Sequence, residues 1–253
     1  MEEKRLKLPV GIQDFVELRN YNALYVDKTE YICRLTQDFK YAFLSRPRRF
    51  GKSMLLSTLA SYFEGRKELF KGLYLEHAEE ELAQQQGREA WGQHPVFYLD
   101  FTTGDYTIPH GLPSRLNTFF SALEAHYGLT VAKGSEEAFG DRFTLLIQAA
   151  YEQTGKQVVV LVDEYDKPLL HNFNKEEAAQ QHEANLNTLA SLFAVLKSCD
   201  RYLRFGLIVG VTRFARVSIF SSVNNLVDIS MMDNYAGLCG ITERELETNL
   251  MHE

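Results

Sequence analysis

One eight-residue stretch, Arg46-Pro-Arg-Arg-Phe-Gly-Lys-Ser53, constrains the fold more than any other part of the chain. An apolar run at residues 41–44 precedes it and another at 54–59 follows it, which predicts a strand, a loop and a helix in that order. Main-chain N–H groups at the start of such a helix converge on an anion, and the helix dipole adds positive potential there. The stretch therefore has the context of a phosphate-binding loop.

Within this loop, we expect Lys52 to reach the β- and γ-phosphates of a nucleotide and the Ser53 hydroxyl to coordinate Mg²⁺. The other loop residues expected to contact the nucleotide are Arg48, Arg49, Phe50, Gly51 and Met54. The usual pattern begins with glycine, whereas this loop begins with Arg46. The alternative is a helix start that happens to carry Gly-Lys-Ser, because short motifs also occur by chance.

A second stretch, further along the chain, favours the first interpretation. After Gln157, residues 158–162 form an uninterrupted, mostly β-branched apolar run, which predicts a central parallel strand buried on both faces. Asp163 and Glu164 follow it directly, at the strand end where ligands bind in open α/β sheets. We expect Asp163 to hold Mg²⁺ and Glu164 to orient and deprotonate the attacking water. Taken alone, this stretch is also compatible with a strand that runs into a polar turn.

Two further strands end in polar residues. The strand predicted at 205–209 leads to Thr212, expected to sense the γ-phosphate, and to Arg213, expected to neutralise transition-state charge on its own nucleotide or a neighbouring subunit's. These roles follow from position rather than from a motif, since both are ordinary strand-end residues. Asp100 closes the strand predicted at 96–101, and parallel strands would place it on the same edge as Asp163.

Composition narrows the class of protein. The 253 residues are 45% hydrophobic, and no apolar run approaches the roughly 20 residues that span a bilayer. The N-terminus lacks the apolar core of a signal peptide, so a cytoplasmic protein is expected. Cys33, Cys199 and Cys239 are odd in number and widely spaced, which indicates neither a disulfide framework nor a metal cluster.

The charge balance argues against one class of partner. Lys and Arg total 27 against 34 Asp and Glu, a net charge of −7. Such an acidic chain is poorly suited to non-specific DNA affinity, which comes chiefly from phosphate neutralisation. We therefore assign the basic cluster of Arg46, Arg48 and Arg49 to nucleotide phosphate, and expect no direct nucleic-acid binding by this core alone.

Predicted strands alternate with helices throughout, which indicates one three-layer, doubly wound, parallel α/β sheet. Only the strand at 96–101 separates the loop strand from the acid-bearing strand along the chain. With Glu164 directly after Asp163, this spacing favours the phosphate-loop ATPases that have an additional strand and a catalytic glutamate. The expected parts are an N-terminal segment at 1–40 packed on the core, the core at 41–241, and the start of a truncated lid at 242–253.

The sequence also predicts several helices and loops outside these motifs. Helices are predicted at 52–64, 111–127, 136–154 and 184–198, with a solvated polar tract at 79–86 and a surface loop at 171–182. Near the N-terminus, 9–16 looks extended. Asp27 and Glu30 have the spacing of a capping box for a short helix that ends near Phe39. Tyr25 is a candidate to stack on the adenine base.

The ordered set of motifs resembles the bacterial AAA-ATPase-like proteins. The stretches that carry the resemblance are Tyr25-Val-Asp-Lys-Thr29, Leu44-Ser-Arg-Pro-Arg-Arg-Phe-Gly-Lys-Ser53, Leu161-Val-Asp-Glu-Tyr-Asp-Lys-Pro168, Gly210-Val-Thr-Arg-Phe214, Ser218-Ile-Phe-Ser221, Asn224-Asn-Leu226 and Gly240-Ile-Thr-Glu243. In that family the phosphate loop looks like the one here, so Arg46 is a family trait. The resemblance implies ATP binding and hydrolysis, with Lys52, Ser53, Asp163 and Glu164 in the roles given above.

Members of that family often continue into a helical lid and a nuclease-like domain, whereas this chain stops at Glu253. The resemblance therefore implies an ATPase core, with any nuclease activity elsewhere. Two hypotheses remain. The first is an ATP hydrolase that drives or gates a partner or a missing C-terminal domain. The candidate partners are a second copy of the chain in a homo-oligomer or a separate effector domain. The second is a nucleotide-binding switch with negligible turnover. No base-reading motif distinguishes ATP from GTP.

Overall fold

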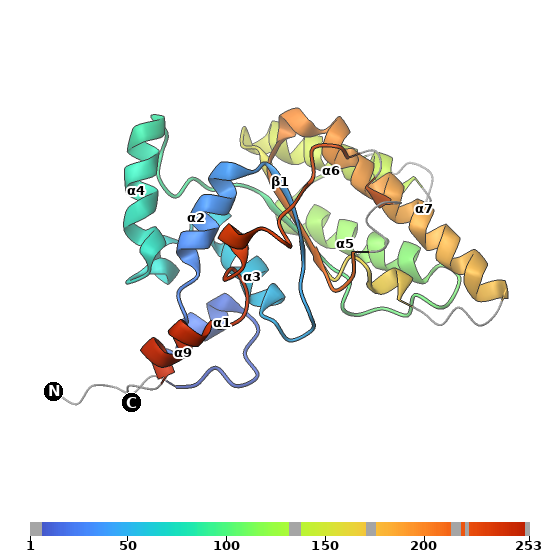
Figure 1. Cartoon of the computed structure of the whole chain (residues 1–253). Coiled ribbons are helices and arrows are strands. Elements are labelled where there is room, and N and C mark those ends of the chain that lie inside the picture. Colours follow the sequence, from blue (N-terminus) through green and yellow to red (C-terminus); the bar gives the residue numbers. More distant parts are fainter. Residues whose placement is uncertain (1–6, 132–137, 171–175, 214–218, 221–222, 251–253) are drawn as a thin grey trace. The chain divides into compact units, whose positions relative to one another are not determined.

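The computed structural model describes most of the chain, in two compact units that are treated separately below (Figure 1). The described residues are 7–131, 138–170, 176–213, 219–220 and 223–250. Unit 1 comprises Met1–Phe39, Arg48–Gln93 and Ile229–Glu253. Unit 2 comprises Lys40–Pro47 and His94–Asp228.

Unit 2 is built on a five-stranded sheet with the order β2-β3-β4-β1-β5. The strands are β1 (Tyr41–Ser45), β2 (Val96–Asp100), β3 (Val158–Asp163), β4 (Leu203–Gly210) and β5 (Val227–Asp228). Every neighbouring pair is parallel. The strand between β1 and β3 in the sheet is β4, although β2 lies between them along the chain. This all-parallel α/β arrangement fits a phosphate-loop fold.

Three helices of unit 2 share one core with the sheet. They are α5 (Gly111–Tyr127), α6 (Phe139–Thr154) and α7 (Glu176–Ser198). Alternate β3 residues point to one face, and Val158, Val160 and Val162 belong to the same buried cluster as residues of all three helices. Phe120 of α5 stacks on Phe143 of α6, with ring centroids 5.5 Å apart. The apolar spacing that predicted these helices therefore corresponds to their buried faces.

The prediction of a surface loop at 171–182 is wrong where the structure describes it. Helix α7 begins at Glu176, and its Gln, Glu and Ala residues form helix readily, although Gln and Glu are polar. Asn185 also anchors this helix, because its buried amide donates hydrogen bonds to the carbonyls of Tyr106 and Pro168. Residues 171–175, and Glu136 at the expected start of another helix, lie outside the described residues.

Unit 1 is mainly helical (Figure 1). Its α-helices are α1 (Phe15–Asn20), α2 (Thr29–Asp38), α3 (Lys52–Phe63), α4 (Tyr74–Gln86) and α9 (Glu243–Leu250). The extended segment expected at 9–16 is wrong at its end, where α1 begins. Asp14 caps that helix by accepting a hydrogen bond from the N–H of Glu17 at 2.8 Å.

The capping box expected at Asp27 and Glu30 is also wrong. The N-cap of α2 is Lys28, and Glu30 pairs with Arg34 on the exposed side of the helix. The Asp27 carboxylate instead accepts hydrogen bonds from the N–H of Thr29 at 2.8 Å and of Tyr74 at 2.7 Å. Asp27 therefore links the start of α2 to the start of α4.

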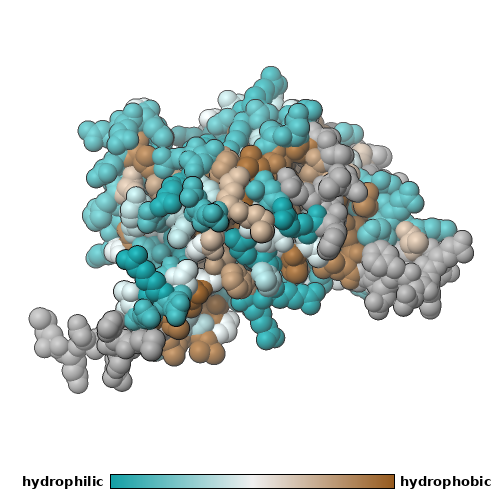
Figure 2. All heavy atoms as spheres, in the orientation of Figure 1, coloured by the Kyte–Doolittle hydropathy of each residue, from teal (hydrophilic) through white to brown (hydrophobic). Residues whose placement is uncertain are grey.

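The polar tract at 79–86 is helical, and hydrophilic atoms cover the outer side of α4 (Figure 2). Glu79 departs from the expected solvated pattern, because it is only 1% exposed. Its carboxylate accepts hydrogen bonds from the Tyr62 hydroxyl at 2.7 Å, the Arg88 guanidinium at 2.5 Å and the N–H of Trp91 at 3.1 Å. Burial raises the pKa of Glu79, but these donors outweigh it and hold that pKa below its usual value.

The three cysteines are buried and free. Among the described residues, no group of three or more His, Cys, Asp or Glu side chains is placed so that it could hold a metal ion. Within that same part of the chain, no helix combines the length and apolarity needed to cross a membrane.

Candidate nucleotide-binding site

The predicted strand, loop and helix are present around the phosphate-loop motif. Strand β1 ends at Ser45 and α3 begins at Lys52. Gly51 caps the helix in the left-handed conformation, with φ of 83°, which favours a residue without a side chain. Lys52 is buried and Ser53 is half-buried. The helix therefore starts at a point where main-chain N–H groups can face an anion.

The start of this loop is attached to the sheet of unit 2. The N–H of Arg46 donates a hydrogen bond to the carbonyl of Gly210 at 3.1 Å. The Ser45 hydroxyl donates to the carbonyl of Val211 at 2.8 Å. These bonds hold the end of β1, and the first loop residue, beside the carboxyl end of β4.

The acid-bearing strand ends at the same edge. Asp100 and Asp163 are register partners of parallel β2 and β3, so the expectation that they share an edge is confirmed. Asp163 is 1% exposed, and its Oδ1 atom accepts a hydrogen bond from the N–H of Glu164 at 2.9 Å. The Tyr98 hydroxyl lies 3.5 Å from Oδ2. Carboxylate oxygens are ligands that Mg²⁺ favours, so this residue fits the ion chemically.

Glu164 has a strained backbone. Its φ is 49°, in the left-handed region, where a residue with a side chain costs about 1–2 kcal/mol. The next residue, Tyr165, returns to the sheet, because its N–H donates to the carbonyl of Val209 at 3.1 Å. The chain thus turns sharply at the residue expected to act as the base.

Asp166 is a residue of this edge that the sequence interpretation missed. Its Oδ2 atom accepts hydrogen bonds from the N–H groups of Val211 at 3.1 Å and Thr212 at 2.7 Å. The Tyr165 hydroxyl donates to the carbonyl of Thr212 at 2.9 Å. Both interactions fix Thr212. The sequence did contain a signal for this role, because Asp166 is an acid three residues after Asp163. A short carboxylate side chain readily accepts hydrogen bonds from main-chain N–H groups.

Gly210 allows this close approach. A Cβ atom at this position would lie 2.5 Å from the Tyr165 ring and 2.7 Å from Oδ1 of Asp166. Neither distance is tolerable in a packed structure. The glycine therefore lets the turn after β3 rest against the end of β4.

Arg213 is engaged within unit 2. Its guanidinium lies 2.7 Å from Oδ2 of Asp228 in β5, and its side chain is half exposed. One guanidinium nitrogen donates to Asp228, so a contact of Arg213 with a phosphate would use the remaining N–H groups or replace this ion pair.

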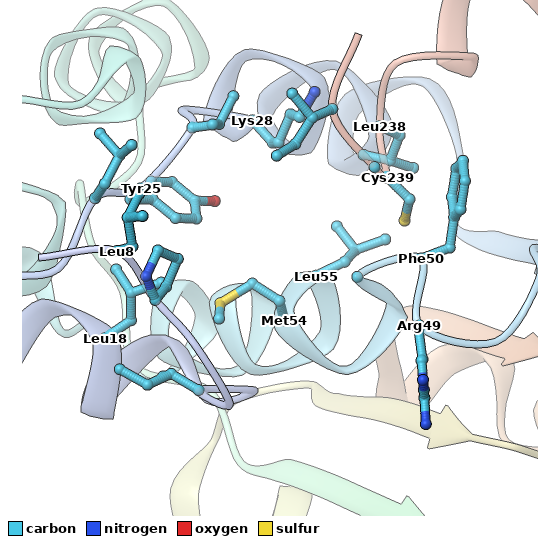
Figure 3. A pocket seen from close by; sticks show the side chains of 17 residues that line it. Leu8, Leu18, Tyr25, Lys28, Arg49, Phe50, Met54, Leu55, Leu238 and Cys239 are labelled. Carbon is cyan, nitrogen blue, oxygen red and sulfur yellow. The ribbon is translucent and has the colours of Figure 1, made fainter. Parts of the chain in front are cut away.

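The predicted site residues thus divide between the two units. Unit 2 brings the first loop residue Arg46, the acids Asp163 and Glu164, and Thr212 to one edge of its sheet. Unit 1 contains the other predicted loop residues, Arg48, Arg49, Phe50, Gly51, Lys52, Ser53 and Met54. Of these, four line a cavity of unit 1 (Figure 3): Arg49, Phe50, Gly51 and Met54.

Comparison with known proteins agrees with these observations. A family model described as "Predicted AAA-ATPase" matches residues 9–220. A protein of Azotobacter chroococcum mcd 1, described as "Uncharacterized protein in vnfD 5'region", is 39% identical over 245 residues. That match covers 96% of this chain and 44% of the relative, so the chain spans less than half of the relative's length. No solved structure matches the chain. The chain belongs to the family described as Predicted AAA-ATPase.

Proposed function

We propose that the chain binds ATP with Mg²⁺ and hydrolyses it. The observation that carries this proposal is the edge of the unit 2 sheet, where Arg46, Asp163 and Thr212 end neighbouring strands or begin their loops. A phosphate-loop start on the same sheet edge as a buried carboxylate is the arrangement that Mg²⁺-dependent phosphoryl transfer uses. The family match supports the same activity.

Each group has a distinct role in the proposed reaction. Lys52 neutralises charge on the β- and γ-phosphates, while Ser53 and Asp163 hold the ion. Bound Mg²⁺ supplies positive charge that stabilises the phosphate oxygens. Glu164 accepts a proton from the attacking water, and Thr212 helps to position that water. The strand order, with β4 between β1 and β3, supports a place among phosphate-loop ATPases with an additional strand and a catalytic glutamate.

Arg213 has a conditional role in this proposal. It neutralises transition-state charge on its own nucleotide or on that of a neighbouring subunit, either with the N–H groups that Asp228 does not engage or after leaving Asp228. We also propose that turnover drives or gates a further domain or partner. The relative's greater length supports that part of the proposal, because the match covers 44% of it.

The test compares wild type with Lys52→Ala and Glu164→Gln. Calorimetry measures ATP binding with and without Mg²⁺, and a phosphate-release assay measures turnover. We expect Lys52→Ala to lose ATP affinity. We expect Glu164→Gln to bind ATP but to lose about 10²–10⁴-fold in rate, because it removes the general base. Glu152→Gln, at an exposed acid of α6, is the matched control.

Two outcomes would contradict hydrolysis at this site. Equal turnover by wild type and Glu164→Gln would remove Glu164 from the mechanism. ATP binding by all variants without phosphate release from any of them would favour a nucleotide-binding switch instead.

A further inference from the structure

Basic residues gather at the amino edge of the unit 2 sheet, at the opposite end of the strands from Asp163. The parallel strands start side by side there, with Tyr41 of β1 paired to Gly206 of β4 and Val158 of β3 paired to Leu203 of β4. Lys40 and the segments 151–157 and 197–204 form this edge, and all of them belong to unit 2. They contain two acids, Glu152 and Asp200, against five basic residues, which are Lys40, Lys156, Lys197, Arg201 and Arg204.

Side-chain contacts hold these segments together. The Gln157 amide donates a hydrogen bond to the carbonyl of Arg201 at 3.0 Å. The guanidinium carbon of Arg201, in the short helix η3 (Asp200–Tyr202), lies 4.4 Å from the ring centroid of Tyr202. The Tyr202 ring in turn lies 5.2 Å from the ring of Tyr151 at the end of α6. We call this surface the amino-edge patch, made of the five basic residues with Tyr151 and Tyr202.

Most of the positive charge in this patch is not balanced by an acid. Lys40 lies 2.9 Å from Oδ1 of Asp200, so that acid is already paired. Within the part of the chain that the structure describes, no ion pair engages the other four basic residues, which are Lys156, Lys197, Arg201 and Arg204. Arg204 is half-buried, and the others are exposed. The patch therefore keeps positive charge that a polyanion can neutralise.

Helix stability explains one of these cations. Lys197 lies in the last turn of α7, where the helix dipole stabilises a positive charge. That effect falls off within the last turn. Arg201 in η3 and Arg204 in β4 lie beyond the helix, so the dipole does not account for them.

The net charge of −7 does not describe this edge, because the acids are unevenly distributed. Helix α4 of unit 1, for example, contains Glu76, Glu79, Glu80 and Glu81. A basic patch attracts a polyanion through its local potential even on an acidic protein. The expectation of no direct nucleic-acid binding was drawn from net charge and did not consider this arrangement.

The row of Arg201, Tyr202 and Tyr151 adds flat surfaces beside the cations. Bases of a single strand stack on aromatic rings and on guanidinium planes, while lysines and arginines contact its phosphates. A duplex keeps its base faces stacked inside, so it can use only the cations. We propose that the amino-edge patch binds single-stranded nucleic acid. The proposal does not depend on ATP hydrolysis, because the predicted catalytic residues of unit 2 lie at the other end of the strands.

The test measures fluorescence anisotropy of labelled oligo(dT) and oligo(U) strands of about 20 nucleotides, titrated with the whole chain at several salt concentrations. The logarithm of the association constant should fall with the logarithm of salt concentration with a slope of about −3, because each of four phosphate contacts contributes roughly 0.7. Stronger binding of one strand would show whether DNA or RNA is preferred. No binding of either strand would overturn the proposal.

Two substitutions separate the charge from the rings. Arg201→Gln should weaken binding about eightfold in about 0.05 M salt and reduce the slope by about 0.7, because one phosphate contact is lost. Tyr202→Leu should weaken binding at least about fivefold without changing the slope, whereas Tyr202→Phe keeps the ring and should bind as wild type does. Arg244→Gln, at an exposed arginine of α9, is the matched control for Arg201→Gln and should change nothing. Urea unfolding of each variant confirms that the fold is intact.

Three results would place the binding elsewhere or change the partner, and each would overturn the proposal. Loss of affinity in Arg48→Gln but not in Arg201→Gln would assign the strand to the phosphate loop. Equal affinity for a duplex of the same length would remove the role of the rings. Equally tight binding of polyglutamate would indicate a surface for acidic proteins. ATP turnover, measured on the same variants, should be unchanged in Arg201→Gln, so failure of the proposed function would be seen separately.

Discussion

The carboxylate of Asp166 accepts a hydrogen bond from the main-chain N–H of Thr212 at 2.7 Å. This bond joins the turn after β3 to the end of β4, two strands that are neighbours in the sheet. In the proposed reaction, Thr212 helps to position the attacking water. Asp166 therefore acts as a positioning residue through Thr212.

Replacing Asp166 by alanine should slow hydrolysis more than it weakens ATP binding. Two half-buried N–H groups would lose their acceptor, and the cost for each lies below the about 1–3 kcal/mol of a fully buried group left unpaired. A small displacement of Thr212 should lower the ATP turnover rate by up to about a hundredfold. Steady-state kinetics and calorimetry separate the two effects. Asp141→Ala, at an exposed residue of α6, is the control, and an unchanged turnover rate in Asp166→Ala would refute the role.

Gly210→Ala should destabilise unit 2. The added methyl group would meet the Tyr165 ring at 2.5 Å, and overpacking of this kind costs about 1–3 kcal/mol. Urea unfolding measures the loss. Tyr165→Leu, alone and combined with Gly210→Ala, completes a double-mutant cycle. If the ring is the obstacle, the combined loss is smaller than the sum of the two single losses.

Glu164→Gly should abolish ATP hydrolysis without destabilising the fold. Relief of the left-handed strain is worth about 1–2 kcal/mol. The greater chain entropy of glycine offsets roughly 0.5–1 kcal/mol of that gain. We therefore expect unchanged or slightly higher free energy of unfolding, measured in urea. Glu164→Gln keeps the strain and serves as the comparison. A clear loss of stability in Glu164→Gly alone would contradict strain at this residue.

Glu79→Gln should destabilise the protein at neutral pH and become nearly neutral in acid. The folded-state pKa of Glu79 is lowered from its usual 4.5, so its ionised form stabilises the fold. That contribution is complete above pH 4.5 and is lost as the pH falls through the lower folded-state pKa. Breaking a fully buried pair costs about 3–5 kcal/mol, and the partial exposure of Arg88 lowers that cost here. Urea unfolding from pH 7 to pH 3 tests this difference.

The matched control for that measurement is Glu81→Gln, at an exposed acid of the same helix. It should change the free energy of unfolding by less than about 0.5 kcal/mol at every pH, as surface substitutions usually do. If the difference in free energy of unfolding between wild type and Glu79→Gln stayed the same in acid, the charge on Glu79 would not stabilise the fold.

Local patterns in the sequence were sufficient for most elements. The helix predicted at 111–127 coincides with α5, and the helix predicted from Lys52 ends within one residue of the expected position. The apolar run before Asp163 is β3, buried along its whole length. Such features depend on the spacing of apolar residues and on terminal glycines, both of which act over a few residues.

Only the tertiary structure decided which distant residues meet. Three relationships join separate elements: the place of β4 between β1 and β3, the hydrogen bond of Asp166 with Thr212, and the hydrogen bond that Tyr62 of α3 donates to buried Glu79 of α4. No local pattern encodes them, because each depends on which strand or helix packs alongside. The sequence by itself determined the motifs and their order, and packing within each unit decided how the polar side chains there are held.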